Sequence, residues 1–427
     1  MSDPLRVGMA GIGTVGTGVA RLLATHAELI ARRAGRPIVL SAVSARNRGR
    51  DRGVDLSAAA WEDDPVALAG RADVDAVVEV VGGSDGPALA TVSRALRAGR
   101  HVVTANKALL AHHGEALAAA AEEARVALRF EAAVAGGIPI VKALGEGLAA
   151  NGLSRVYGVL NGTSNFILTE MARTGRDYGD VLAEAQAKGY AEADPSFDVG
   201  GVDAGHKLAL LASLAFGCRV DFDGVRVEGI ERLSLADIRS AASFGYTIKL
   251  LGVARRAAGG ILRSVQPCLV RADSAIGQLP GVTNAVVCEA DFAGQTVYEG
   301  PGAGEGPTAS AVVADLIDIA RGNFGAPFGV PSAMLTPLDT AIDPPAPHYL
   351  RFRLQDRPGA LAGIAQSLGE EAVSIRAMHQ DGESGGAATV VILTHACERG
   401  ALDRALCAIA DSPVSLEPPV ALRIEDV

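Results

Sequence analysis

Ionisable side chains are densest between residues 189 and 207. A loop there carries three carboxylates, at Glu192, Asp194 and Asp198. Asp203 and Lys207 follow, four residues apart on a predicted helix, so they share one face. On an exposed helix that spacing is usually a solvated ion pair, but residues 208–216 are almost wholly apolar, which predicts a largely buried helix. A partly buried lysine among carboxylates can transfer protons when burial or a second cation brings its pKa toward neutral.

A glycine loop at residues 11–16 predicts dinucleotide binding. Its sequence is Gly11-Ile12-Gly13-Thr14-Val15-Gly16, directly after a short apolar strand, Leu5–Ala10. Gly11 permits a tight turn, Gly13 lets the backbone approach a pyrophosphate, and Gly16 lets the next helix pack closely on the strand. Free N–H groups at the helix start would hold the phosphates. We expect all six residues to contact the cofactor, with an ordinary strand-to-helix turn as the alternative.

The segment after the second predicted strand bears on the choice of nicotinamide. NAD-specific sites usually place Asp or Glu about 20 residues after the glycine loop. Here the strand ends at Arg46, and the first acidic residue after it is Asp51. Arg46, Arg48 and Arg50 either hold a 2′-phosphate, to which guanidinium groups pair well, or form an exposed basic loop. We expect NADP and leave NAD open.

Three further segments carry candidate site residues. Thr104-Ala105-Asn106-Lys107 follows a predicted strand, at the sheet edge where ligands bind in doubly wound folds. Lys107 therefore either faces cofactor and substrate or is a surface lysine. Residues 161–165, which include Gly162 and Thr163, either present polar groups to a small ligand or form a turn. The loop 131–137 either offers carbonyl oxygens to a monovalent cation or is a plain connection.

The composition excludes several other classes of protein. The 427 residues suffice for about three domains, and 49% hydrophobic with 21% charged residues is typical of a soluble globular protein. The net charge of −10 includes no long run of one sign, which argues against nucleic-acid or anionic-membrane binding. Scattered cysteines without C-x-x-C, and the lack of H-x-x-H and G-x-S-x-G, exclude a disulfide framework, a zinc site and serine hydrolase chemistry. Without a signal peptide or an apolar run of membrane-spanning length, we expect a cytoplasmic protein.

Alternating strands and helices must position the glycine loop and Lys107. A helix is expected from the glycine loop to about Arg33, and the expected strands are Leu5–Ala10, Ile38–Val43, Val74–Val81, His101–Val103 and Val126–Phe130. This alternation predicts a doubly wound, Rossmann-like α/β domain over residues 1–148. A later helix, Thr308–Arg321, follows a Gly-Pro-Gly segment and is expected to pack back on this domain, completing it with residues 300–325.

Residues 149–300 predict an α+β domain for substrate binding and dimerisation. The expected strands are Arg155–Leu160, Ile261–Val270 and Asn284–Ala290, and the expected helices are Val181–Lys188, Asp203–Phe216 and Ala236–Ala254. A proline-rich linker spans 326–347. Residues 348–427 then predict the ferredoxin-like order β-α-β-β-α-β, with a turn at Asp356–Gly359 before the first helix.

Taken together, these motifs closely resemble homoserine dehydrogenase of the type with a C-terminal ACT domain. The matching segments are Gly11–Gly16, Thr104–Lys107, Glu131 with Gly136–Ile140, Asn161–Asn165, Gly189–Pro195, Asp203 with His206–Leu208, and Gly300–Gly304. Asp356–Leu361 resembles the opening of an ACT domain. The segment Ser44–Asn47 departs from the family's more usual Arg-Asp pairing, which keeps the coenzyme preference open.

The resemblance implies reversible hydride transfer between NAD(P)H and C4 of L-aspartate 4-semialdehyde, giving L-homoserine on the way to threonine, methionine and isoleucine. It makes Lys207 the acid/base, Lys107 a polarising or relaying group and Asp203 the partner that holds Lys207. It also implies substrate contacts from Glu192, Asp198, Thr163 and Gly162, and further cofactor contacts from Arg46, Thr104, Lys107, Gly304 and Glu305. A sodium or potassium ion would be held by main-chain oxygens of Glu131, Val134, Gly136 and Ile138.

The resemblance also implies regulation and assembly. Feedback by an amino acid, L-threonine in the first instance, would act at an interface between two ACT domains, with candidates at Gly359–Ile364. The chain would form a homodimer or homotetramer, with the middle domain as the dimer surface. The alternatives are another amino-acid dehydrogenase, or an amino-acid sensor without catalytic activity.

Overall fold

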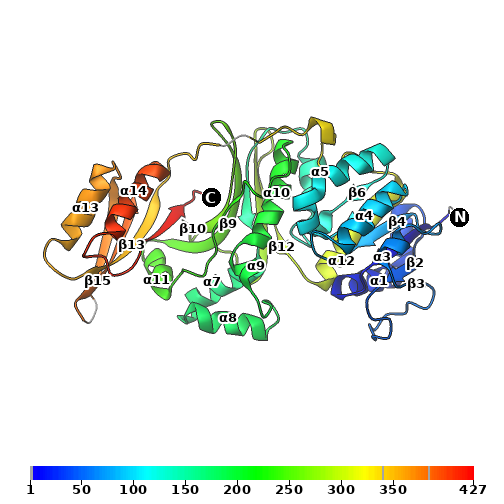
Figure 1. Cartoon of the computed structure of the whole chain (residues 1–427), viewed down its shortest axis with the longest axis horizontal. Coiled ribbons are helices and arrows are strands. Elements are labelled where there is room, and N and C mark those ends of the chain that lie inside the picture. The colour runs from blue at the N-terminus through cyan, green and yellow to red at the C-terminus, as the bar shows by residue number, and fades with distance from the viewer. Residues whose placement is uncertain (1–2, 339–340, 383–384) are drawn as a thin grey trace.

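The computed structural model describes residues 3–338, 341–382 and 385–427. Three parts follow one another along the molecule, with the N-terminal part at one end and the C-terminal part at the other (Figure 1). The helices of the described ranges include none that is long and apolar enough to cross a membrane.

The first part is built on a parallel six-stranded sheet in the order β3-β2-β1-β4-β5-β6. Its strands are β1 (Leu5–Ala10), β2 (Ile38–Ser44), β3 (Ala60–Glu62), β4 (Ala76–Glu79), β5 (His101–Thr104) and β6 (Leu128–Arg129). Apolar residues on both faces of β1 and β4 are buried, as a central parallel strand requires. The strand order reverses between β1 and β4, and ligands bind at such a switch point. The predicted Rossmann-like fold is confirmed, although β3 was not predicted and β4 is shorter than expected.

Helices cover both faces of this sheet. They are α1 (Thr14–Thr25), α2 (Ala27–Ala34), α3 (Pro65–Ala69), α4 (Pro87–Arg97) and α5 (Lys107–Ala124), followed by the short turns η1 (Glu131–Ala133), α6 (Ile140–Lys142) and η2 (Ala143–Gly147). The single helix expected up to Arg33 is instead two, because His26 leaves the helical conformation between α1 and α2. Helix α12 (Glu305–Arg321) returns to pack beside α1, as predicted, where Gly18 allows Glu305 to approach.

The middle part is a mixed sheet with helices on one face. Its strands are β7 (Leu153–Val159), β8 (Arg226–Val227), β9 (Tyr246–Ala257), β10 (Gly260–Arg271), β11 (Thr283–Ala290) and β12 (Gly294–Pro301). Its helices are α7 (Gly162–Thr174), α8 (Tyr178–Ala187), α9 (Ser196–Val199), α10 (Val202–Phe216) and α11 (Leu235–Ser243). Helix α10 packs against β7, β9 and β10, which buries the apolar run that follows Lys207.

The helix expected over Ala236–Ala254 is wrong in its second half. Helix α11 ends at Ser243, Gly245 adopts a positive φ of 80°, and the chain then runs as the strand β9. Strand β9 pairs with β10 along twelve residue pairs in an antiparallel hairpin, from Tyr246–Arg271 to Ala257–Gly260. Pairing with a strand later in the chain overrides the local helical pattern.

The C-terminal part has the predicted order β-α-β-β-α-β. It consists of β13 (His348–Gln355), α13 (Ala360–Glu370), β14 (Ile375–Gly382), β15 (Ala387–Thr394), α14 (Arg399–Ala410) and β16 (Val420–Ile424). Strand β16 also pairs in parallel with β10, so the C-terminal strands and the middle strands form one ten-stranded sheet. The proline-rich connection contains the short turn η3 (Ser332–Met334), and its residues 339–340 lie outside the described ranges. The sequence predicted neither this shared sheet nor the contact that makes it.

Candidate active site

Two lysines from different domains meet at one buried carboxylate. Asp203, in the first turn of α10, is 4% exposed. Its Oδ2 lies 2.7 Å from Lys207 Nζ, and its Oδ1 lies 3.0 Å from the Nζ of Lys107, the first residue of α5. Lys207 Nζ also donates a hydrogen bond of 2.7 Å to the carbonyl oxygen of Leu160, at the end of β7. Asp203 and Lys207, predicted from their helical spacing, therefore lie in one site with Lys107, predicted from its position at the sheet edge.

Asn161 orients the carboxylates of this site. It is the N-cap of α7, where its Oδ1 accepts a 2.8 Å hydrogen bond from the Ser164 N–H. Its Nδ2 donates to Asp198 Oδ1 at 2.8 Å and to Asp203 Oδ2 at 2.9 Å. The Asn161 side chain thus fixes the start of α7 and both acids. The predicted 161–165 segment is here a helix start, and the part played by the Leu160 carbonyl has no side-chain signature in the sequence.

The charges of this cluster shift one another's titration. Burial opposes ionisation of Asp203, but both lysine ammonium groups and the hydrogen bonds from Lys207 and Asn161 outweigh it and hold its pKa below the usual range. Burial lowers the pKa of Lys207, and the charge of Lys107 lowers it further, against the opposing effect of Asp203. Burial, with the nearby charge of Asp203, raises the pKa of Asp198. A lysine with a lowered pKa is suited to giving and taking a proton.

Aromatic rings form a wall beside the two lysines. His206 is buried against Phe222, with ring centroids 4.2 Å apart, and against His112 at 5.3 Å. Burial and the neighbouring charges lower the pKa of His206 to about 4, which keeps the ring neutral. Phe197 of α9 packs against His206, and Lys107 Nζ lies 5.8 Å from the Phe197 ring centroid. The sequence did not predict this wall.

The predicted substrate residues lie at different distances from this cluster. Asp198 joins it through Asn161, whereas Thr163 Oγ1 donates to the Tyr190 carbonyl oxygen at 2.6 Å and ties the 189–195 loop to α7. A side chain on Gly162 would meet the Val282 carbonyl oxygen at 2.7 Å. Glu192 is exposed on the loop, and no hydrogen bond or ion pair within the described ranges joins its side chain to the lysines. The structure therefore brings together four of the predicted residues, Lys107, Asp198, Asp203 and Lys207, and leaves Glu192 apart.

The glycine loop has the shape of a phosphate cradle. Gly11 has a φ of 102°, and a Cβ there would lie 2.6 Å from the Val80 carbonyl oxygen. A Cβ on Gly16 would overlap the Gly11 carbonyl oxygen, whereas a Cβ on Gly13 would meet no protein atom. The open space at Gly13 fits a pyrophosphate above the start of α1, where Thr14 and Val15 are the first helical residues.

A buried acid, Glu79, fixes the loop after β4, which approaches the glycine loop at Val80. Thr104 Oγ1 donates a 2.6 Å hydrogen bond to Glu79 Oε2, so this hydroxyl is engaged within the fold. Glu79 Oε1 accepts hydrogen bonds from the N–H groups of Val81 and Gly82, which fixes the loop after β4 at the switch point. Glu79 was not among the predicted residues, because an acid inside an apolar strand has no motif of its own.

The other predicted cofactor residues lie after β2 and at the start of α12. Arg46 is exposed after β2. Gly304 has a φ of 115° at the start of α12, and Glu305 forms an ion pair with Arg21 of α1. The sequence did not predict Arg52, whose Nε donates to the Ile12 carbonyl oxygen at 3.0 Å. It also did not predict that Arg48 and Arg52 would lie over the ring of Trp61, at 5.5 and 5.4 Å from its centroid.

The loop proposed for a monovalent cation is well ordered by hydrogen bonds. Glu131 accepts N–H groups of Val141 and Lys142 at 2.9 Å each, while the main-chain oxygens of Glu131 and Ile138 accept from Val134 and Ile140. Burial and the charge of Asp315 raise the pKa of Glu131 to about 7. In the described ranges, no group of three or more His, Cys, Asp or Glu side chains could hold a metal ion. A cation here would need main-chain ligands, such as those of Val134 and Gly136.

Comparison with known proteins gives one consistent family. Residues 139–317 match the family model "Homoserine dehydrogenase", residues 11–131 match "Homoserine dehydrogenase, NAD binding domain" and residues 348–411 match "ACT domain". A homoserine dehydrogenase from Neisseria gonorrhoeae is 45% identical over 433 residues, which cover 99% of each chain.

Solved structures agree with these matches. The crystal structure of a homoserine dehydrogenase from Thiobacillus denitrificans has a TM-score of 0.93 and 42% identity, covering 99% of each chain. A hyperthermophilic archaeal homoserine dehydrogenase in complex with NADPH has a TM-score of 0.65 and 26% identity, covering 76% of this chain and all of that one. With a dinucleotide fold, a lysine pair at its sheet edge and relatives aligned over the full length, this chain belongs to the homoserine dehydrogenase family.

Proposed function

We propose that this nicotinamide-dependent oxidoreductase reduces L-aspartate 4-semialdehyde to L-homoserine, with Lys207 as the proton donor. The observation that carries the proposal is the Lys107–Asp203–Lys207 cluster at the carboxyl edge of the dinucleotide-binding sheet. When bound, a reduced nicotinamide supplies the hydride. As hydride reaches the carbonyl carbon, negative charge builds on its oxygen, and an adjacent ammonium group stabilises and then neutralises that charge.

Asp203 and Lys107 complete the proton path in this proposal. Asp203 keeps Lys207 protonated until the alkoxide forms, because its carboxylate lies 2.7 Å from the ammonium group. Lys107, with its side chain 29% exposed, is placed to polarise the carbonyl and to return a proton from solvent. In the reverse direction, neutral Lys207 accepts the hydroxyl proton of homoserine.

We assign the amino-acid head group of the substrate to the loop side of the cluster. Asp198 offers a carboxylate for the α-ammonium group, and Asn161 already orients that carboxylate. Gly162 and Thr163 present the start of α7 to the α-carboxylate, which the free N–H groups there favour. Glu192 would reach the substrate once the exposed 189–195 loop closes over it.

We propose NADP as the preferred coenzyme. The loop after β2 has no early acid for a ribose 2′-hydroxyl, and Arg46, Arg48 and Arg50 offer guanidinium groups for a 2′-phosphate. Gly11–Gly16, Thr104, Lys107, Gly304 and Glu305 complete the proposed cofactor site. A sodium or potassium ion is assigned to the main-chain oxygens of Glu131, Val134, Gly136 and Ile138, where two consecutive positive φ angles at Ala135 and Gly136 turn the backbone.

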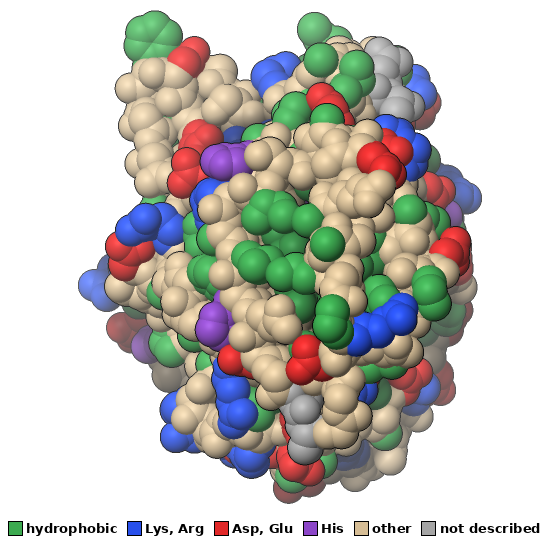
Figure 2. All heavy atoms as spheres, turned by 90° about the vertical axis from the view of Figure 1, so that its left-hand side faces the viewer, with side chains coloured by type: hydrophobic (Ala, Val, Ile, Leu, Met, Phe, Trp, Pro, Cys, Tyr) green, Lys and Arg blue, Asp and Glu red, His purple; other side chains and the backbone are tan. Residues whose placement is uncertain are grey.

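Regulation and assembly follow as further parts of the proposal. L-Threonine is proposed to bind at Gly359–Ile364, between the ACT domains of two chains in a homodimer or homotetramer. Apolar side chains gather near the centre of the molecular face at the ACT end, with charged groups around them (Figure 2). Among the large apolar side chains of the ACT domain, Met378 and Leu416 are 46% and 44% exposed. We propose domain boundaries at residues 148, 300, 326 and 348. We also propose a cytoplasmic location, because all five cysteines are free thiols.

The test follows the absorbance of reduced nicotinamide with purified protein and a panel of amino alcohols and amino acids. We expect L-homoserine to give the highest kcat/KM, and NADP to exceed NAD. A higher kcat/KM with another amino acid would make the chain a different dehydrogenase. Tight amino-acid binding without turnover, in folded protein, would make it a sensor.

A further inference from the structure

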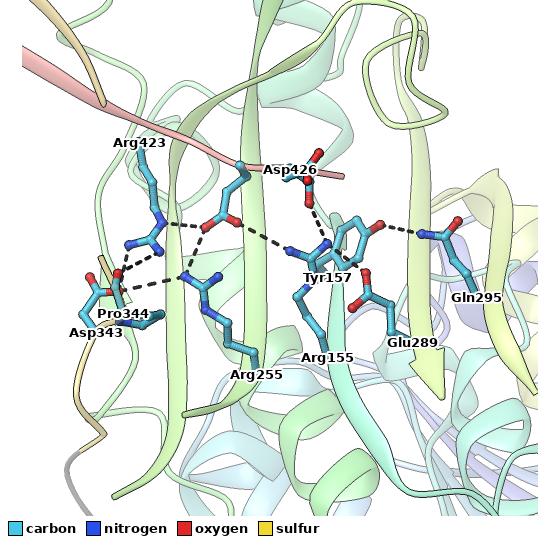
Figure 3. Close-up of polar contacts among 10 residues, drawn as sticks. Arg155, Tyr157, Arg255, Glu289, Gln295, Asp343, Pro344, Arg423 and Asp426 are labelled. Carbon is cyan, nitrogen blue, oxygen red and sulfur yellow. Dashed lines mark hydrogen bonds and ion pairs between the residues drawn. The ribbon is translucent and has the colours of Figure 1, made fainter. Parts of the chain in front are cut away.

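The last described residues leave the ACT domain and lie against the mixed sheet of the middle part. This sheet, with strands β7, β9, β10, β11 and β12, is called the catalytic sheet below. Strand β16 pairs with β10 in parallel through Arg423–Cys268 and Ile424–Leu269, and the Glu425 N–H donates to the Leu269 carbonyl oxygen at 2.9 Å. Residues 423–426 thus belong to both domains. Figure 3 shows Arg155 of β7 and Arg255 of β9 pointing toward this segment, which itself contributes Arg423.

Glu425 fills a place between two arginines of the catalytic sheet. Arg155 on β7 and Arg255 on β9 lie directly opposite each other in the antiparallel register. Like charges at such positions repel. Glu425, 4% exposed, lies between them, with its Oε2 3.6 Å from Arg155 Nη1 and its Oε1 3.3 Å from Arg255 Nη2. Glu425 of the ACT domain therefore supplies a counter-charge to both arginines, and Glu289 of β11 supplies a second one to Arg155.

Glu425 and the arginines around it make further contacts with the interdomain connection, with Asp426 and with β11. Arg423 Nε lies 2.7 Å from Glu425 Oε1, and its Nη1 lies 2.7 Å from Asp343 of the interdomain connection. Arg155 Nη2 donates to the Asp426 carbonyl oxygen at 2.8 Å and to Glu289 of β11 at 2.9 Å. Arg155 is consequently held by the tail and by the neighbouring strand at once.

Strand β7 leads from this network to the lysine pair. Arg155 is near its start, and Leu160, whose carbonyl oxygen accepts the hydrogen bond from Lys207, directly follows its end. Asn161, which binds Asp198 and Asp203, comes next. At the rise per residue of a strand, Arg155 and Leu160 are roughly 16 Å apart. A displacement of β7 along its axis would therefore move both a partner of Lys207 and the residue that orients Asp203.

We propose that residues Glu425 and Asp426 position β7 for catalysis by holding Arg155, and that movement of the ACT domain reaches the lysine pair through this contact. Glu425 and Arg155 are positioning residues in this scheme, since neither touches the reacting atoms. The proposal rests on the proposed function for its catalytic consequence, but the contact between the tail and β7 can be tested without it.

The test compares Glu425→Gln, Glu425→Asp, Arg155→Met and the Glu425→Gln/Arg155→Met double variant in the full-length protein. We expect Glu425→Gln to lower kcat about tenfold, because small misplacements of catalytic groups cost that much or more. KM for homoserine should rise as well, because Asn161 also orients Asp198, which the proposed function assigns to the α-ammonium group of the substrate. Glu425→Asp should recover part of kcat, and the double variant should be no slower than the slower single variant, because both changes break one contact.

Hydrogen exchange of the 153–160 segment supplies a readout independent of turnover. Exchange should accelerate in Glu425→Gln and Arg155→Met, and stay normal in the control Glu371→Gln, which removes an ion pair with Arg404 elsewhere on the ACT domain. If Glu425→Gln does not fold, Glu425→Asp and Arg155→Lys should show intermediate exchange and kcat. Normal exchange and normal kcat in folded variants would overturn the proposal. If the parent protein does not oxidise homoserine, the proposed function fails, and the exchange data alone decide whether the tail holds β7.

Discussion

Asp203 holds two ammonium groups with its two oxygens, and this arrangement sets the direction of the pH dependence. Burial lowers the pKa of Lys207 from the ordinary 10.5, while the charge of Asp203 opposes that shift. In the proposed mechanism semialdehyde reduction uses protonated Lys207, so its rate should fall as pH rises through the pKa of Lys207. Homoserine oxidation needs neutral Lys207, so its rate should rise over the same range.

Asp203→Asn tests this arrangement. The variant removes the carboxylate that raises the pKa of Lys207, so the decline of kcat for reduction should begin at lower pH. We also expect kcat at neutral pH to fall by about 10²-fold, the scale of general acid–base catalysis. The measurement is kcat against pH in both directions, with the exposed Asp180→Asn on α8 as control. An unchanged pH profile would show that Asp203 does not set the titration of Lys207.

The identities of the central residues could be predicted from local patterns, and their supports could not. Asp203 and Lys207 have helical spacing before an apolar run, and Lys107 follows a strand at the ligand edge. The Leu160 carbonyl leaves no mark in the sequence because every residue has one. Arg52 and Trp61 meet only through the fold of the connection between β2 and β3, which has no periodic pattern.

At the scale of elements, two residues of the glycine loop serve different purposes, Gly13 in binding the cofactor and Gly16 in folding. A Cβ at Gly13 meets no protein atom, whereas a Cβ at Gly16 overlaps the Gly11 carbonyl oxygen. Gly13→Ala should therefore keep the Tm of the parent and raise the Kd for NADPH by roughly tenfold, since the methyl group enters the pyrophosphate space. Gly16→Ala should destabilise the protein by about 1–3 kcal/mol, as overpacking does. Equal Tm losses in both variants would contradict this assignment.

The contact between η1 and α12 predicts a pH-dependent stability. Burial raises the pKa of Glu131 to about 7 and that of Asp315 to about 6, above their unfolded values of 4.5 and 3.8. A carboxyl with a raised folded pKa contributes full stability below its unfolded pKa and loses it as pH rises through the folded value. Glu131 and Asp315 should therefore lower the Tm as pH rises from about 4 to 7, whereas His206, whose pKa is lowered to about 4, acts in the opposite sense over the same range.

The Tm of Glu131→Gln should rise relative to that of the parent as pH increases over this range, because the amide does not ionise. The exposed Glu146→Gln on η2 is the matched control and should keep the parent's slope. Thermal unfolding across the pH range, without added sodium or potassium, measures both. If the Tm of Glu131→Gln changed with pH in the same way as that of the parent, ionisation of Glu131 would cost the folded protein no stability.

Elements differ in how well the sequence predicts them. Strands β1, β2, β4, β5 and β6 and helix α10 were predicted from apolar runs, and the apolar residues of these runs are buried. Strand β9 was predicted as helix because its pattern Tyr246–Ala257 is resolved only by pairing with β10. Strand β16 was predicted as the last strand of the ACT segment, but its pairing with β10, more than 150 residues earlier in the chain, was not.

At the scale of the whole molecule, two sheets organise three domains. The ACT strands continue the catalytic sheet through β10 and β16, while the lysine pair lies where α10 meets the dinucleotide domain. This continuity joins the ACT domain to the sheet of the middle part through the pairing of β16 with β10. The shared sheet could not be predicted, since the proline-rich segment between the domains indicates a separating linker.

The two outer strands of that sheet bear on assembly. Strands β12 and β14 end the ten-stranded sheet, and exposed sheet edges readily pair with another chain. The chain mass is 43.5 kDa. Light scattering should therefore give a mass two or four times this value, as the proposed homodimer or homotetramer requires. A mass of one chain at working concentration would contradict the proposed assembly.

The most direct test of the central claim measures homoserine oxidation by the parent protein and by Lys207→Met. The parent should reduce NADP in the presence of L-homoserine, and Lys207→Met should lose about 10²-fold or more in kcat while still binding NADPH and keeping its Tm. Lys188→Met, which removes an exposed lysine paired with Glu184 on α8, should be unaffected. Near-normal turnover by a folded Lys207→Met variant would contradict the assignment of Lys207 as the proton-transfer group.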